Sequence, residues 1–165
     1  MQKKETGSDT KSLNKKDEFK LERYKFILQQ LNSLNEGTHK YIALFQTLAT
    51  AVLGAGITIF AAWREIKIDA GIARLGIRAV LYLFTILTLF VILSIVINTI
   101  SWFDYRKEEV ELLSKEVGGD FRQLPSLKNA WRWNETYFVI FLFAVLLVVW
   151  VFAEQWLIPT ISNNG

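Results

Sequence analysis

The sequence contains no cysteine and a single histidine, His39. The absence of cysteine excludes disulfides, thiolate metal sites and cysteine nucleophiles. No group of His, Asp and Glu residues has the spacing of metal ligands. The sequence therefore predicts neither a metal nor any other cofactor.

Charge is missing from three long stretches, residues 41–63, 79–103 and 137–153. A helix needs about 20 apolar residues to cross the roughly 30 Å of hydrocarbon in a bilayer, and core helices of soluble proteins rarely run that far without a charged face. Trp131, Trp133, Tyr137 and Trp156 bracket the shorter third stretch, as an interfacial aromatic belt would. We therefore predict three transmembrane helices.

The lack of charge in these stretches also bears on function. Membrane-embedded enzymes, proton relays and voltage sensors need ionisable groups within the bilayer. The predicted spans offer only hydroxyl and amide side chains. We expect no enzymatic activity and no ion-coupled transport.

Lys and Arg residues are distributed unevenly among the segments between the spans. Residues 1–40 hold nine of them, residues 64–78 hold four, residues 104–136 hold six, and the chain after residue 153 holds none. The side that carries more Lys and Arg is normally cytoplasmic. The prediction is a multi-pass protein of the bacterial inner (plasma) membrane, with a cytoplasmic N-terminus and a periplasmic or extracellular C-terminus.

The predicted fold class is an all-α membrane protein. Leu21, Tyr24, Leu28 and Leu31 form a narrow apolar seam, which predicts an amphipathic helix that ends near Gly37. The predicted order is a disordered polar tail (1–16), the cytoplasmic amphipathic helix (17–38), transmembrane helix 1 (41–63), an outer connector (64–78), transmembrane helix 2 (79–103), a cytoplasmic helical connector (104–135), transmembrane helix 3 (136–158) and an outer tail (159–165).

Small and hydroxyl side chains recur along the first span at steps of three and four residues: Ala43, Thr47, Thr50, Gly54, Thr58 and Ala61. Such a stripe lets helix backbones approach closely. It can alternatively face a water-filled lumen. The sequence leaves both uses open.

A second set of polar residues lies on the second span. Ser94, Asn98 and Ser101 share a helical face, and we expect them at the depth of Gln46, Thr47 and Thr50. Buried amides need hydrogen-bond partners, so this cluster either joins helices or lines a hydrated vestibule. Beyond it, Leu53, Ile57 and Phe60 are candidates for an apolar gate that closes by dewetting.

Three helices cannot enclose a water path and also shield it from lipid. A pore would therefore need several copies of the chain around an axis. The predicted partners are the lipid bilayer and the chain itself, as a cyclic homo-oligomer.

Basic and aromatic residues alternate before the third span. Arg122, Lys128, Trp131, Arg132 and Trp133 are candidates for binding a nucleotide or a short single strand, because aromatic rings stack on bases while cations hold phosphates. The alternative is an interfacial tryptophan belt with cations reaching the headgroups.

The order of these parts resembles the small membrane effectors of bacterial anti-phage systems. A charged helix (ERYKFILQQLNSLNEGTHK) runs into a span rich in small residues (YIALFQTLATAVLGAGITIF), followed by a second span and a cytoplasmic helix. This layout is similar to the pore-forming SLATT class and to the three-span membrane effector of Hailong systems. The resemblance implies a homo-oligomeric channel that depolarises an infected cell under the control of a nucleotide or of a DNA oligomer made by a partner nucleotidyltransferase. The alternative is a non-conducting membrane scaffold or an accessory subunit.

Overall fold

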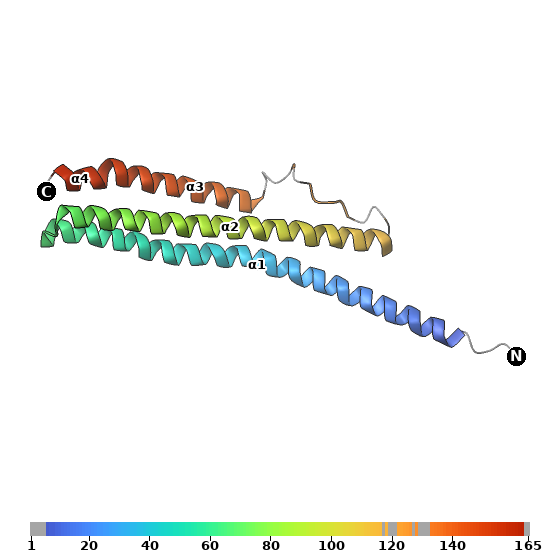
Figure 1. The fold of residues 1–165 in the computed structure, drawn as a ribbon. Helices are drawn as coiled ribbons and strands as arrows, with labels where there is room; N and C mark the ends of the chain where they lie inside the picture. The colour runs from blue at the N-terminus through green and yellow to red at the C-terminus, as the bar shows by residue number, and fades with distance from the viewer. Residues whose placement is uncertain (1–5, 117, 119–121, 127, 129–132, 164–165) are drawn as a thin grey trace. The chain divides into compact units, whose positions relative to one another are not determined.

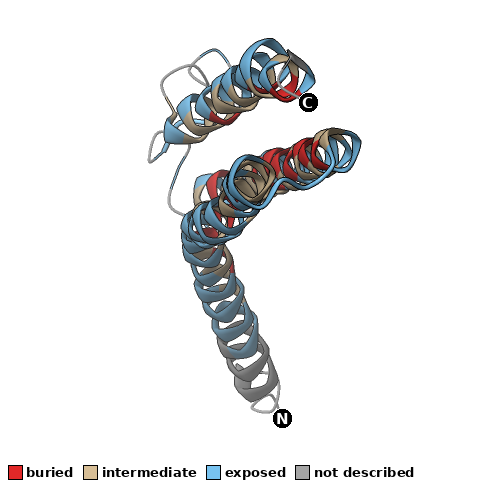
Figure 2. Cartoon of the chain, turned by 90° about the vertical axis from the view of Figure 1, so that its left-hand side faces the viewer, coloured by how far each residue is buried: buried red, intermediate tan, exposed pale blue. Residues whose placement is uncertain are grey.

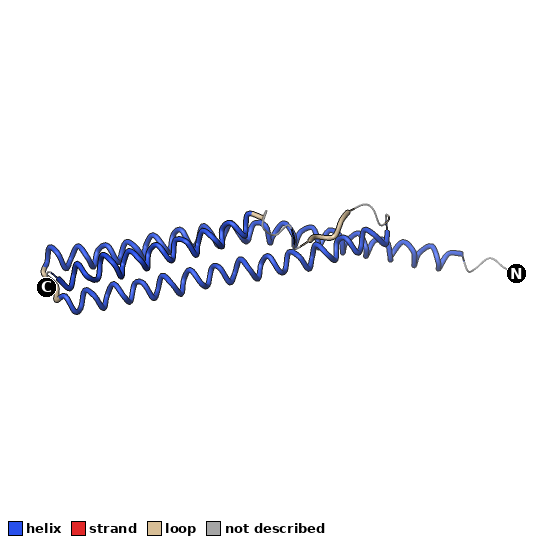
Figure 3. The backbone as a smooth tube through the Cα atoms, turned by 90° about the horizontal axis from the view of Figure 1, so that it is seen from above, coloured by secondary structure: helices blue, strands red, loops and turns tan. Residues whose placement is uncertain are grey.

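The computed structural model describes residues 6–116, 118, 122–126, 128 and 133–163. Every regular element among these residues is helical (Figures 1 and 3), in the order α1 (Thr6–Ile66), α2 (Ala70–Glu116), α3 (Asn134–Phe152), the π-helical turn η2 (Ala153–Leu157) and α4 (Ile158–Asn163). Three segments are long and apolar enough to cross a membrane: Lys15–Ile66, Ala70–Glu116 and Asn134–Ser162. The predicted all-α class with three long apolar helices is confirmed.

The chain divides into two compact units. The first comprises Met1–Glu36 and Thr99–Leu127, and the second comprises Gly37–Asn98 and Lys128–Gly165. Helices α1 and α2 each contribute to both units, whereas α3, η2 and α4 belong to the second.

The second unit has two apolar cores along its helices. Phe45 of α1, Phe84 and Ile95 of α2, and Leu142 of α3 belong to one of them. Ile77 of α2 and Ile161 of α4 belong to the other. The helical face turned toward these cores is buried, as the red segments in Figure 2 show.

Most large apolar side chains outside these cores are exposed. Ile86 is 65% exposed and Leu147 is 64% exposed, and both lie in the middle of charge-free helical stretches. Soluble proteins rarely expose apolar patches of this extent. Exposed apolar side chains of this extent are stable in contact with lipid hydrocarbon. The described helices are therefore those of a multi-pass membrane protein.

A three-residue turn, Lys67–Asp69, joins α1 to α2. Lys67 has the left-handed φ of 57° that commonly ends a helix. One carboxylate oxygen of Asp69 accepts hydrogen bonds from the backbone N–H groups of Gly71 (2.8 Å) and Ile72 (3.1 Å), which caps α2. These three residues are the only non-helical part of the predicted outer connector 64–78.

Other predicted boundaries also differ from the structure. Helix α1 begins at Thr6, within the tail predicted to be disordered, and it passes through Gly37 instead of ending there. Gly37 packs closely on α2, because a Cβ atom at this position would lie 3.4 Å from Oδ1 of Asn98. Interhelical packing thus outweighs the helix-breaking preference of glycine, which costs about 1 kcal/mol.

The connector before α3 is helical over only part of the predicted 104–135. Helix α2 ends at Glu116, Gly118 has a φ of 122°, and residues 122–126 are not helical. At the other end of α3, the π-helical turn η2 ends at Leu157, two residues before Pro159. Proline has no N–H to donate and its ring clashes with the preceding turn. Pro159 therefore explains why the helix widens into a π-helical turn here.

Two glycines provide a matched test of the α1–α2 packing. A Cβ atom on Gly76 would lie 3.3 Å from two side-chain atoms of Ile59, whereas one on Gly54 would meet nothing within 4 Å. We expect Gly76→Leu to lower the unfolding free energy in mixed micelles by about 1–3 kcal/mol through overpacking. Gly54→Leu should leave it unchanged or raise it by up to about 1 kcal/mol, because leucine is the better helix former, and an equal loss for both variants would contradict the packing described.

Candidate functional site

The stripe of small and hydroxyl residues, here called the hydroxyl face, lies on the outside of the second unit. Its members are Ala43, Thr47, Thr50, Gly54, Thr58 and Ala61. The first three and Thr58 are exposed, and Gly54 and Ala61 are half-buried. The hydroxyl face is therefore not used to pack the helices of one chain.

Helical geometry explains this exposure. Residues nine apart lie about 180° apart around a helix that turns about 100° per residue. Thr47 is nine residues before Gly56, whose missing Cβ would lie 3.3 Å from Val80 of α2, and the buried Ala49 is nine residues before Thr58. The hydroxyl face thus lies directly opposite the side of α1 that packs on α2.

The three threonine hydroxyls of this face donate hydrogen bonds to their own helix. Thr47 donates to the carbonyl of Ala43 (3.1 Å), Thr50 to that of Gln46 (2.7 Å) and Thr58 to that of Gly54 (2.9 Å). Their donors are satisfied without a second helix, so the face can lie against lipid, another helix or water at little polar cost.

The polar residues of α2 lie elsewhere. The amide Nδ2 of Asn98 donates to Oγ1 of Thr38 at 2.9 Å, and Thr38 lies about two turns before Gln46 along α1. Ser94 donates to the carbonyl of Phe90 (2.9 Å), and Ser101 is half-buried in the first unit. Asn98 therefore joins two helices of one chain.

The three gate candidates occupy another side of α1. Leu53, Ile57 and Phe60 line an apolar cavity of about 520 Å³ within the second unit, together with residues of α2, α3 and η2. Ile57 is 69% exposed, so this cavity opens at the surface of the second unit. The three gate candidates lie beside the hydroxyl face and not on it.

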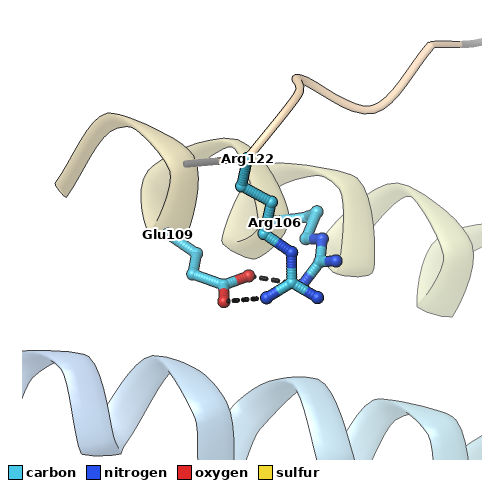
Figure 4. Close-up of polar contacts among 3 residues, drawn as sticks. All are labelled: Arg106, Glu109 and Arg122. Carbon is cyan, nitrogen blue, oxygen red and sulfur yellow. Dashed lines mark hydrogen bonds and ion pairs between the residues drawn. The ribbon is translucent and has the colours of Figure 1, made fainter. Parts of the chain in front are cut away.

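The first unit contains a buried carboxylate that the sequence analysis did not single out. The side chain of Glu109 on α2 is 0% exposed, and Figure 4 shows its carboxylate facing the guanidinium groups of Arg106 and Arg122. Arg106 approaches one of its oxygens at 2.5 Å and Arg122 the other at 2.8 Å. A buried charge is tolerated only when it is paired and hydrogen-bonded, and here both oxygens are engaged.

Further pairs join α1 to α2 at the surface of this unit. Arg23 bonds to Glu108, and Lys20 bonds to Glu116 at 2.7 Å. The hydrogen bond to Glu116 raises the pKa of Lys20 above its usual 10.5. In the same unit, Ile27 and Leu31 of α1 are buried.

The candidate ligand-binding residues do not form one described site. Arg122 belongs to the first unit and bonds to Glu109, while Lys128 and Trp133 belong to the second. Lys128 is exposed, and Trp133 immediately precedes α3. Trp131 and Arg132 lie outside the described residues.

The described residues show no grouping of three or more His, Asp or Glu side chains that could hold a metal ion. Comparisons with protein-family models, with curated proteins and with solved structures found no match to this chain. The function must therefore be argued from the chain itself.

The glutamate cluster allows a direct test of the first unit. Arg106→Gln should destabilise the folded chain by about 1–3 kcal/mol, because it leaves the carboxylate of Glu109 buried with one partner fewer. Arg23→Gln is the matched control, since its pair with Glu108 is exposed and worth about 1 kcal/mol or less. Thermal loss of helical circular dichroism in micelles measures both, and equal effects would contradict the special role of Glu109.

Proposed function

We propose that the chain assembles into a homo-oligomer in which the hydroxyl face of α1 lines an ion-conducting pore. The observation that carries this proposal is the position of the face, exposed and opposite the side of α1 that packs on α2. Hydroxyl groups favour water more than the surrounding Leu, Ile and Phe side chains do. Copies related by cyclic symmetry would turn the same face toward a common axis.

The proposed orientation follows from the Lys and Arg bias. The first unit, with its amphipathic part of α1 and the end of α2, would lie in the cytoplasm of a bacterial cell. The C-terminus would lie on the outer side of the plasma membrane.

The absence of cysteine makes this orientation testable by single-cysteine labelling. Ser33 and Ser162 are both exposed and lie in the proposed inner and outer segments. In intact cells, a membrane-impermeant maleimide should label Ser162→Cys and spare Ser33→Cys. The reverse pattern would invert the topology, and permeabilised cells provide the control for reactivity.

We further propose that the pore is an effector of anti-phage defence controlled by a nucleotide or a short single-stranded DNA. This part rests on the resemblance in layout. Of the candidate residues, Arg122 already bonds to Glu109. Lys128 is exposed just before α3, in the unit that carries the proposed pore lining, so it is the first residue to test for ligand control.

The second candidate function is a non-conducting scaffold. The observation that favours it is that the three threonine donors bond to their own helix, which leaves a smooth face suited to close helix contact. In that case the hydroxyl face would hold the oligomer together without admitting water.

Ion leakage from liposomes separates the two functions. Thr50→Leu should lower leakage roughly tenfold, as about 1.4 kcal/mol of added barrier would do, because the apolar side chain favours dewetting. Ala55→Leu is the control, since Ala55 is exposed beside the hydroxyl face and not on it. Oligomers are counted by crosslinking in the same liposomes.

Loss of the oligomer in Thr50→Leu would favour the scaffold, and full leakage with intact oligomers would contradict the pore lining. Short oligonucleotides added to these liposomes test ligand control. They should alter leakage through the original chain and act more weakly on Lys128→Gln.

A further inference from the structure

We propose that the second unit binds an anionic phospholipid, with one acyl chain in the apolar cavity and the phosphate beside the α1–α2 turn. This proposal is independent of conduction through the hydroxyl face. It rests on two adjoining spaces, one apolar and one basic, that share Phe60 as a common wall.

The apolar cavity has the properties of an acyl-chain site. It measures about 520 Å³, and each of its twelve lining residues is apolar or glycine, including Ile57 on α1, Val80 on α2 and Val148 on α3. The cavity opens at the surface, since Ile57 and Val148 in its lining are 69% and 64% exposed, and an unfilled space forfeits dispersion contacts along its walls. In a bilayer, the available filler is a hydrocarbon chain.

The second space, here called the turn pocket, has the properties of a headgroup site. It measures about 780 Å³ and includes Trp63, Arg64, Lys67 and Asp69 among its lining residues. The Asp69 carboxylate is engaged by the backbone N–H groups that it caps. Among the residues that the structure describes, neither Arg64 nor Lys67 forms an ion pair, so both cations can meet a phosphate.

The backbone of Lys67 adds a second indication. Its φ of 57° is a left-handed conformation that favours glycine, and a residue with a side chain pays a conformational cost there. A lysine at this position brings a cation to the turn pocket despite that cost. Trp63 lies in the same pocket, and tryptophan is typical of the headgroup level of a membrane.

The size and polarity of the two spaces select the occupant. A helix of a second copy is about 10 Å across, so 520 Å³ would hold roughly one turn of it. A single flexible chain fits this space better. An anionic phospholipid also places its negative charge beside Arg64 and Lys67, which a zwitterionic lipid does less well.

The test is native mass spectrometry of the full chain in detergent, titrated with dioleoyl phosphatidylglycerol or dioleoyl phosphatidylcholine. We expect saturable binding of phosphatidylglycerol, roughly tenfold tighter than that of phosphatidylcholine. Arg64→Gln with Lys67→Gln should weaken phosphatidylglycerol binding by about tenfold, as the loss of two partly exposed ionic contacts would do. Lys107→Gln, an exposed cation of the first unit, serves as the charge control.

The cavity has its own matched pair of variants. Val148 and Leu147 are adjacent on α3 and are both 64% exposed, but only Val148 lines the apolar cavity. Val148→Trp should therefore block lipid binding while Leu147→Trp preserves it, with helical circular dichroism confirming that both fold. A Val148→Trp variant that folds and retains phosphatidylglycerol would overturn the proposal.

Two further outcomes would overturn it. If all variants retained both lipids equally, the lipids would only coat the apolar surface as a detergent does, without a specific site. Competition by inorganic phosphate as effective as that by the whole lipid would mean that the turn pocket binds a free anion without the chain. The expected result is that inorganic phosphate at the same concentration does not displace the lipid.

Discussion

The structure depends on one constraint, the need of every backbone N–H and C=O group in hydrocarbon to find a partner within the chain. Helices meet it along their length, and their ends are the weak points. At the turn between α1 and α2 only three residues are not helical, and the Asp69 side chain bonds to the exposed N–H groups of Gly71 and Ile72. The short turn and its cap thus allow two long helices to pack side by side within each unit.

The same constraint governs the polar side chains of the spans. Thr85 accepts a hydrogen bond from the indole of Trp150 at 2.9 Å while donating to the carbonyl of Leu81, and Asn98 donates to Thr38. Among the described residues, no buried side-chain nitrogen or oxygen lacks a partner. Hydrogen bonds between helices are worth only about 0.6 kcal/mol on average in membranes, so these contacts select a register more than they supply stability.

The sequence predicted the features that follow from the spacing of apolar and charged residues. It did not predict which side chains of different helices contact each other. The three long helices were predictable because charge-free stretches of such length have few other uses. The register was not: Asn98 was expected at the depth of Gln46, yet it meets Thr38, because the ends of apolar stretches do not fix how two helices align. The Arg106–Glu109 pair was visible as an i, i+3 spacing, but the contribution of Arg122 from beyond α2 was not.

In the second unit, the hydroxyl face of α1 and the side that carries Leu53 and Phe60 suit different neighbours. The threonine donors of the hydroxyl face are satisfied by its own backbone, so copies of this face can surround a common lumen without leaving a donor unpaired. The side that carries Leu53 and Phe60 borders an apolar space that the chain itself leaves open, and a flexible apolar molecule can fill it. If both proposals hold, a lipid between α1 and α3 would contact the same helix whose hydroxyl face lines the pore. Lipid composition would then act on conduction through the packing of α1, without any contact between the lipid and the permeating ion.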